Sequence, residues 1–134
     1  MTTSDPSPSH PRIRLRLDFG ARGRIGPGKI DLIEAVGRTG SISAAGRAMG
    51  MSYRRAWLLV GAINEMFVEP VVISHAGGRD GGRDGGGAEL TGFGAALIAA
   101  YRRLEARTEA AATAELGDII ARLVEPGTNA RRES

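Results

Sequence analysis

Apolar residues recur at helical spacing in the middle of the chain. From Ala56 to Phe67 they fall at i, i+3, i+4, i+7, i+10 and i+11, which places them on one face of an amphipathic helix: Ala56, Leu59, Val60, Ile63, Met66 and Phe67. Ser52 precedes this run and is a suitable N-cap residue. The pattern therefore predicts a helix over residues 52–67.

A shorter helix is predicted immediately upstream, where the hydroxyl of Ser41 or Ser43 can cap its first turn. Three small side chains in it allow another helix to pack closely: Ala44, Ala45 and Ala48. The turn Met49-Gly50-Met51 separates this helix from the next one. Two short helices joined in this way form a helix-turn-helix, an arrangement that points to DNA binding.

The first turn of the second helix lies off the apolar face and is polar, with Ser52, Tyr53, Arg54 and Arg55. In a recognition helix this end meets base edges and phosphates in the major groove. The stretch from Ala35 to Asn64 has no acidic residue, and its cations are Arg38, Arg47, Arg54 and Arg55. A solvated helix surface is the alternative explanation of the charge alone.

Polar and apolar residues alternate strictly from Arg12 to Phe19, the period of a half-buried strand. One row, of Ile13, Leu15, Leu17 and Phe19, is expected to face a core. The other row holds Arg12, Arg14 and Arg16, which can contact DNA, although arginine on the solvated face of an edge strand is the commoner explanation.

The segment Pro27 to Val36 is predicted to be a helix, with Ile30 and Ile33 on one face and with Gly37 and Gly40 around its end. Just before it, Gly23 to Lys29 matches G-x-x-x-x-G-K, the pattern of a phosphate-binding loop. Ile30 stands where Ser or Thr would hold magnesium, so nucleotide hydrolysis is disfavoured. A turn that caps the helix and leaves Lys29 near a phosphate explains the same residues.

Two short β-strands are predicted after the second helix, Val71 to Ile73 and Ala88 to Leu90. The loop between them, GGRDGGRDGGG, occupies the position of the wing in a winged helix and carries Arg79 and Arg83. Its glycines let the backbone approach a phosphate closely. Asp80 and Asp84 leave the loop nearly neutral, so a plain hairpin remains the alternative.

A helical region opens at Thr91 and carries a long apolar stripe, resumed after an alanine-rich link from Ala106 to Ala114. Such a stripe exceeds what a small core must cover, which favours a symmetric dimer over a helix that folds back on its own domain. Whether residues 106–124 continue one helix or form a second is open. The predicted dimer interface consists of Phe93, Leu97, Tyr101, Leu104, Leu116, Ile119, Ile120 and Leu123.

Composition limits the kinds of protein and of functional site that this chain can be or contain. With 134 residues there is room for one domain plus an arm or tail, and the chain has a formal net charge of +3 and no cysteine. A thiolate metal site and a cysteine nucleophile are thereby excluded. His10 and His75 have no sequence-adjacent partner for catalysis, so we predict no enzyme, no catalytic residues, no metal and no cofactor. No apolar run reaches transmembrane length, so the default is a cytoplasmic protein without a membrane partner.

The order strand, helix, helix-turn-helix, glycine-rich wing and long helix resembles the N-terminal DNA-binding domain of the molybdate-responsive ModE regulators, which are related to the LysR-type winged helices. The resemblance covers Arg12 to about Arg107. It depends on GSISAA at 40–45, MSYRRAW at 51–57, INEMF at 63–67 and GGGAELTGFG at 85–94. It implies a mainly α fold with a small β-hairpin wing and a long C-terminal dimerisation helix. It also implies a dimer that regulates genes of molybdate uptake and molybdenum enzymes.

Mapped onto that pattern, Ser52, Tyr53, Arg54 and Arg55 match the start of the family's recognition helix. Arg54 and Arg55 are implied to contact guanine or phosphates, with Ser52 as the cap and Tyr53 stacking or positioning. Capping fully explains Ser41 and Ser43, which can also reach phosphates, as can Arg47, while Arg79 and Arg83 would lie along a minor groove or backbone. Trp57, at the edge of the apolar face, is expected to pack in the core.

The expected organisation is a disordered leader (1–11), a winged helix-turn-helix domain (12–91), a dimerisation region (92–124) and a disordered tail (125–134). The family's molybdate-binding domain is not expected in this chain, so molybdate sensing is not carried over. We predict a sequence-specific regulator that binds double-stranded DNA as a homodimer. It acts constitutively, responds through its own abundance or depends on a separate effector-sensing protein. The alternatives are a protein–protein adaptor and a nonspecific DNA-binding protein.

Overall fold

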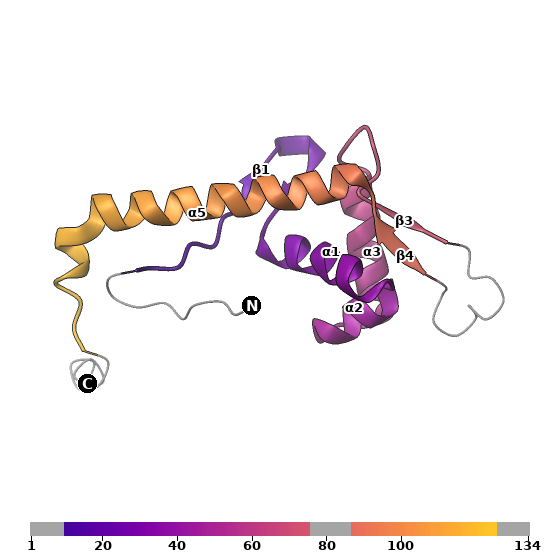
Figure 1. Cartoon of the computed structure of the whole chain (residues 1–134), viewed down its shortest axis with the longest axis horizontal. Coiled ribbons are helices and arrows are strands. Elements are labelled where there is room, and N and C mark those ends of the chain that lie inside the picture. The colour runs from indigo at the N-terminus through magenta and orange to yellow at the C-terminus, as the bar shows by residue number, and fades with distance from the viewer. Residues whose placement is uncertain (1–9, 76–86, 126–134) are drawn as a thin grey trace. The chain divides into compact units, whose positions relative to one another are not determined.

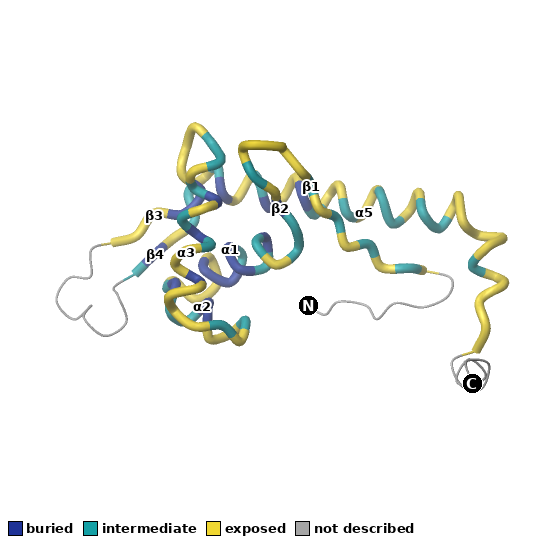
Figure 2. Tube along the Cα trace, turned by 180° about the vertical axis from the view of Figure 1, so that it is seen from behind, coloured by how far each residue is buried: buried dark blue, intermediate teal, exposed yellow. Residues whose placement is uncertain are grey.

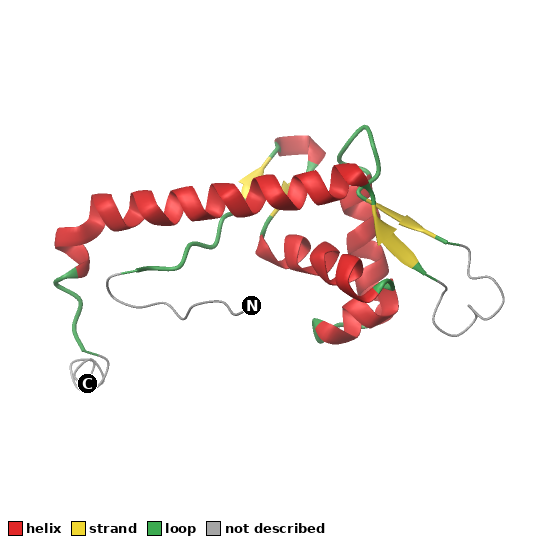
Figure 3. Ribbon diagram, in the orientation of Figure 1, coloured by secondary structure: helices red, strands yellow, loops and turns green. Residues whose placement is uncertain are grey.

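The computed structural model describes residues 10–75 and 87–125, and this part of the chain is mainly helical with small antiparallel β-pairs (Figures 1 and 3). This confirms the expectation of a mainly α protein with a small β-hairpin. The chain divides into two compact units. One contains residues 14–102, and the other contains, among the described residues, 10–13 and 103–125.

The predicted N-terminal strand is shorter than its pattern. Only β1 (Leu17–Asp18) forms a strand, paired with β2 (Arg24–Ile25) around the short 3-10 helix η1 (Gly20–Arg22). The alternation of exposed and half-buried residues nevertheless holds from Arg12 to Asp18. Phe19 breaks it with 47% exposure, so the expectation that it faces the core is wrong. The reason is local, because Gly20 adopts a left-handed φ of 68° and turns the chain away.

Helix α1 (Pro27–Thr39) begins after Gly26 and ends at Gly40, whose φ of 77° lets its amide donate back to Val36 O. It therefore runs three residues beyond the predicted Val36. Ile25 of β2 is 1% exposed, so the G-x-x-x-x-G-K segment forms a buried strand and a helix start. Lys29 Nζ donates to Arg24 O at 2.8 Å within the same turn. The segment thus forms the start of the helix, as the capping-turn interpretation expects, while a phosphate near Lys29 stays a prediction.

Two further helices follow, α2 (Ile42–Ala48) and α3 (Tyr53–Asn64), and they pack on α1. Helix α3 ends at Asn64, so the predicted span of 52–67 is too long at its C-terminal end. After Asn64 the last turn tightens, since the amide of Met66 donates to Ile63 O. The Asn64 side chain ties this end to the next segment, because Oδ1 accepts from the amides of Val71 and Val72 and Nδ2 donates to Val72 O. Met66 and Phe67 still pack against the core, from the loop that follows.

Strands β3 (Val72–Ser74) and β4 (Ala88–Leu90) form the predicted antiparallel pair, with Val72 opposite Leu90 and Ser74 opposite Ala88. The first of them lies one residue later than expected. The amide of Ala88 donates to Gly40 O at 2.9 Å, which ties the hairpin to the end of α1. Arg79 and Arg83 lie outside the described residues.

Helix α5 (Gly92–Ile120) is one continuous helix, which answers the question left open for residues 106–120. Thr91 caps it, since its hydroxyl accepts from the amide of Gly94 and donates to Pro70 O. Gly94 lies so close to β3 that a Cβ there would stand 2.3 Å from Val71 O. This close approach lets Ile98 and Tyr101 reach the core.

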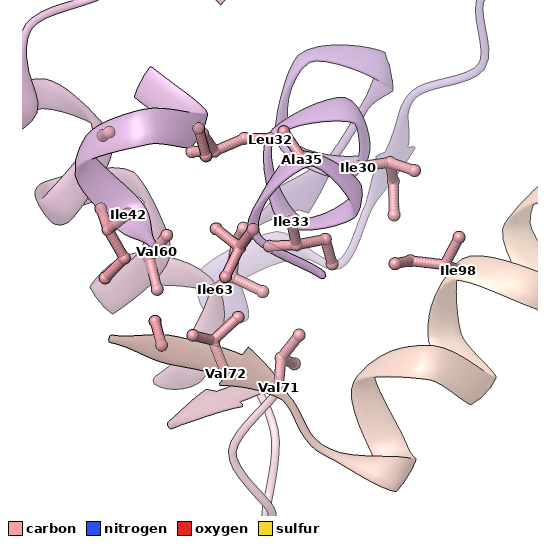
Figure 4. Close-up of a cluster of buried hydrophobic side chains, with 14 of the residues drawn as sticks. Ile30, Leu32, Ile33, Ala35, Ile42, Val60, Ile63, Val71, Val72 and Ile98 are labelled. Carbon is pink, nitrogen blue, oxygen red and sulfur yellow. The ribbon is translucent and has the colours of Figure 1, made fainter. Parts of the chain in front are cut away.

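The core of residues 14–102 joins side chains from α1, α2, α3, the β3–β4 pair and the start of α5 (Figures 2 and 4). Figure 4 shows Val71, Val72 and Ile98 around the side chains of Ile33 and Ile63. Ile30 and Ile33 are fully buried, as their spacing predicts. The buried apolar residues are Ile25, Ile30, Leu32, Ile33, Ala35, Val36, Ile42, Ala45, Ala56, Val60, Ile63, Val71, Val72, Ala88, Ile98 and Tyr101.

The second unit has no buried side chain among its described residues. Within this unit the amide of Ile13 donates a hydrogen bond to Glu109 Oε2 at 3.1 Å. Within the described residues, no helix combines the length and the hydropathy needed to cross a membrane.

Candidate nucleic-acid interface

The turn between α2 and α3 depends on two glycines. Gly46 is buried, and a Cβ on it would stand 3.0 Å from the Cβ of Ala56, so its absence lets the two helices approach closely. Gly50 has a φ of 73°, which an L-residue rarely adopts. The amide of Met51 donates to Gly46 O at 2.9 Å and closes the turn. These contacts fix the direction in which α3 leaves α2.

The alanines predicted to line this contact differ in burial. Ala45 is fully buried and Ala44 is half-buried. Ala48 is exposed, so the expectation that it contributes to close packing is wrong. Ala48 is the last residue of α2, and the chain already turns away there.

Serine hydroxyls cap both helices. Ser41 Oγ accepts from the amide of Ala44 at 2.9 Å, and Ser52 Oγ accepts from the amide of Arg55 at 3.1 Å. Each contact satisfies one backbone donor that a helix start leaves without an intrahelical partner. Ser43 lies inside α2 and accepts from Arg47 Nη1 at 3.0 Å, so Ser41 is the cap of the two candidates.

The first turn of α3 is exposed. Tyr53, Arg54 and Arg55 all point away from the core, and Tyr53 is 46% exposed. Within residues 10–75 and 87–125, the guanidinium groups of Arg54 and Arg55 make no ion pair. Together with Arg38 and Arg47, which are also exposed, they lie in the stretch from 35 to 64 that has no acidic residue. The α3 start therefore presents unneutralised positive charge next to the positive end of a helix dipole.

Trp57 corrects the sequence analysis. We expected its indole to pack in the core, but it is 52% exposed, and Leu58 beside it is 49% exposed. The core face of α3 is occupied by the smaller Ala56, Val60 and Ile63. Sequence reasoning assigned Trp57 by residue type and passed over Leu58. The spacing of the residues indicates this exposure, because Trp57 and Leu58 lie three and four positions after the exposed Arg54, on the same helix face.

Lys29 is placed apart from the other candidate contacts. It lies in the first turn of α1 and is held by the carbonyl of Arg24, whereas α2 follows the last turn of α1. The 13 residues of α1 span about 20 Å at the usual rise of a helix. Ser41, Ser43 and Arg47 thus belong to α2 and Ser52 caps α3, the next helix, whereas Lys29 lies in the first turn of α1.

The predicted dimer residues separate into two groups. Tyr101 is buried, and its hydroxyl donates to Leu15 O at 2.6 Å, so it serves the core of its own chain and is not available to a partner. Phe93 and Leu97 also pack against that core. The others lie at or beyond the middle of α5, where Ile120 is half-buried and the rest are exposed: Leu104, Leu116, Ile119 and Leu123. Leu123 follows the end of the helix.

Fold and site together define a small helical protein that presents a basic, serine-capped helix end beside a tight inter-helix turn. Comparison with known proteins finds relatives that match part of the chain. The chain is 49% identical over 83 residues to the molybdenum-pterin-binding protein MopB of Rhodobacter capsulatus, a match that covers 62% of this chain and 29% of that protein. It is 37% identical over 98 residues to the molybdenum transport protein ModE of Azotobacter vinelandii, covering 73% of this chain and 35% of that protein.

The DNA-binding transcriptional dual regulator ModE of Escherichia coli is 36% identical over 75 residues, covering 56% of this chain and 27% of that protein. No family model matches the chain. The chain spans about a third of the length of these curated relatives. Over roughly two thirds of its own length it is thus related to ModE and Mop proteins, of which the sequence motifs indicated ModE.

Proposed function

We propose that this protein is a sequence-specific DNA-binding transcriptional regulator with a winged helix-turn-helix. In this proposal α2 and α3 form the helix-turn-helix, α3 is the recognition helix, and β3 and β4 are the strands of the wing. The observation that carries the proposal is the start of α3, where a capped helix end exposes Tyr53, Arg54 and Arg55 in a stretch without acidic residues. The names of relatives that describe transcriptional regulators support it.

The proposed contacts follow from side-chain chemistry. Arg54 and Arg55 donate to the O6 and N7 acceptors of guanine or to paired phosphates, and Tyr53 stacks or positions the helix. Ser41, Ser43 and Arg47 of α2 and the N-cap Ser52 of α3 bind the flanking phosphates, since each carries a hydroxyl or guanidinium that can donate to a phosphate oxygen. Lys29, Arg79 and Arg83 complete the proposed set of backbone contacts from the N-terminus of α1 and from the wing.

We further propose a homodimer formed through the exposed apolar residues of the second half of α5. A two-fold dimer requires a palindromic operator whose half-sites lie about one helical turn apart or a multiple of it. Because the relatives' names concern molybdenum, the regulated genes proposed are those connected with molybdenum. The proposed role is binding, without catalysis.

The test is fluorescence anisotropy of the full chain against the duplex upstream of its own gene and a scrambled duplex, at two salt concentrations and with and without molybdate. The expected result is a preference for the native duplex that persists at higher salt. The double variant Arg54→Ala, Arg55→Ala should lose about 1–3 kcal/mol per base-reading contact. The matched control is Arg22→Ala, Arg103→Ala, which removes two exposed arginines outside α2 and α3.

Equal, salt-sensitive binding to both duplexes would replace the proposal with a nonspecific DNA-binding protein. An absence of binding to either duplex, with protein partners still bound by the Arg54→Ala, Arg55→Ala variant, would identify an adaptor. A molybdate effect on affinity would show that the chain itself responds to this anion.

A further inference from the structure

The solvent face of α3 changes character after its first turn. Arg54, Trp57, Leu58 and Gly61 follow the spacing i, i+3, i+4 and i+7, so they form one stripe on the helix. The stripe begins with a cation and continues with an exposed indole and an exposed leucine side chain. Ala62, exposed beside it, adds no polar group. The centre of this face is therefore apolar, which is unusual for a solvated helix surface.

The fold does not require this composition. The core side of α3 is complete with Ala56, Val60 and Ile63. A Cβ at Gly61 would meet nothing within 4 Å among the described residues, so none of them demands a glycine there. Glycine inside a helix is less favourable than alanine. Gly61 thus weakens the helix without relieving a contact in the part of the chain that the structure describes, and it leaves the stripe open to a close approach from outside.

The geometry points to DNA base edges as the occupant, and we propose that Trp57 and Leu58 read the C5-methyl groups of thymines in the major groove. This inference rests on the proposed function and names what that site recognises. The stripe is continuous with Arg54, and no acidic residue between 35 and 64 opposes a polyanion. Homeodomain recognition helices read bases with residues at the same i, i+3, i+4 and i+7 spacing. Thymine is the base that presents a methyl group in that groove.

The spacing of the stripe predicts the arrangement of the operator. Leu58 lies four residues after Arg54, which is about 6 Å along the helix axis. Base pairs are stacked about 3.4 Å apart. Each half-site should therefore contain a guanine contacted by Arg54 and one or two thymines about two base pairs away. The absence of a side chain at Gly61 allows the helix backbone to approach these bases.

The experiment first selects tight-binding duplexes from a random pool with the full chain. Each thymine of the selected half-site is then replaced singly by deoxyuridine, which removes only the C5-methyl group. For the wild-type chain, the replacement at the contacted positions should weaken binding about fourfold, the effect of exposing one buried methyl group. Leu58→Ala and Trp57→Ala should bind the thymine duplex more weakly and should lose most of the discrimination against deoxyuridine.

Val68→Ala is the matched control, because this aliphatic side chain is 102% exposed and lies beyond the end of α3. It should keep both the wild-type affinity and the wild-type discrimination. Circular dichroism and thermal unfolding test whether each variant keeps the wild-type fold. Gly61→Ala separates folding from recognition, since it should raise the thermal midpoint of unfolding and yet weaken binding to the selected duplex.

Two outcomes overturn the inference while leaving the proposed function intact. In the first, the selected duplex requires Arg54 and Arg55, but deoxyuridine has the same effect on the wild type and on Leu58→Ala and Trp57→Ala. In the second, Gly61→Ala stabilises the chain and binds DNA as well as the wild type. If no duplex is enriched at all, the proposed function fails and the inference fails with it. Protein capture that depends on Trp57 and Leu58 would then assign the stripe to a protein partner.

Discussion

Helices α3 and α5 both carry apolar residues at helical spacing, but the two stripes meet different surroundings. The core-facing residues of α3 are covered within the chain, where Ala56, Val60 and Ile63 are buried, although Trp57 and Leu58 on its other face are exposed. In α5 the buried residues are Gly94, Ile98 and Tyr101, all within its first ten residues. Beyond Arg102 no described residue of α5 is buried (Figure 2).

The difference shows that helical periodicity identifies an apolar face but not what covers it. A 12-residue helix such as α3 is short enough for one small core to cover. The 29 residues of α5 extend about 44 Å, more than the core of a domain this small can cover. An uncovered apolar face on a regular helix is typical of an association surface. Substitutions in one helix at a time test whether the apolar faces of α3 and α5 differ in this way.

The largest effect is expected from the uncovered stripe of α5. Replacing Leu116 and Ile119 with aspartate places charges where the proposed dimer buries apolar side chains. Each side chain contributes about 1.5–3 kcal/mol when fully buried, and a two-fold dimer loses four of them, so dimer affinity should fall by at least about ten thousandfold. Sedimentation equilibrium over a range of concentrations measures the change. The double variant Ala111→Asp, Ala114→Asp, at exposed positions off the stripe, is the control that should still associate.

If the Leu116→Asp, Ile119→Asp variant associates as the wild type does, the dimer does not use this stripe. The exposed apolar residues in the second half of α5 would then contact a partner other than a second copy of the chain. A wild-type chain that sediments as a monomer at every concentration would reject the homodimer itself.

The covered half of α5 should respond to Gly94→Ala. The added Cβ would stand 2.3 Å from Val71 O, a backbone atom that cannot move without shifting β3. Overpacking of this kind costs about 3 kcal/mol, to be measured by urea unfolding. Gly117→Ala in the same helix has open space around it and should stabilise by up to about 1 kcal/mol. Equal effects of the two substitutions would contradict the contrast between the halves.

Much of the fold could be predicted from local patterns. The cap Ser52, the turn at Gly50 and the antiparallel β3–β4 pair are each encoded within a few residues, so the sequence indicated them correctly, whereas for the other cap it left Ser41 and Ser43 open. The end of α3 was placed too late because Met66 and Phe67 keep the helical spacing. The helix ends earlier, with a tightened last turn in which the amide of Met66 donates to Ile63 O, and Asn64 bonds to a strand eight residues away.

The candidate site was harder to predict where burial depends on distant residues. Trp57 was assigned to the core by residue type, although its spacing from Arg54 places it on the exposed face of α3. Likewise, Tyr101 looked like a member of the dimer stripe. Its hydroxyl reaches Leu15, 86 residues earlier in the chain, and no local pattern signals such a contact.

A smaller effect is expected from Tyr101→Phe, which keeps the ring in the core and removes the hydroxyl. Leu15 O would lose a donor at 2.6 Å in a partly buried position. The expected loss is about 1–2 kcal/mol in the free energy of unfolding. Tyr53→Phe, on the exposed face of α3, removes the same group and should change stability by less than about 0.5 kcal/mol. If both substitutions cost the same, the hydroxyl of Tyr101 does not anchor α5.

The smallest effect concerns the start of α3. Ser52→Ala removes the acceptor of the Arg55 amide and should cost about 1 kcal/mol of stability, the usual value of an N-cap. Ser43→Ala, whose hydroxyl accepts only an exposed guanidinium, should cost less than about 0.5 kcal/mol. Denaturant unfolding compares the stability of the two variants, and fluorescence anisotropy with the upstream duplex compares their affinity for DNA. Because Ser52 orients the turn that carries Arg54 and Arg55, its loss should weaken DNA binding beyond any effect on folding. A Ser52→Ala chain that is destabilised and yet binds DNA at full affinity would separate the cap from recognition and leave it a purely structural role.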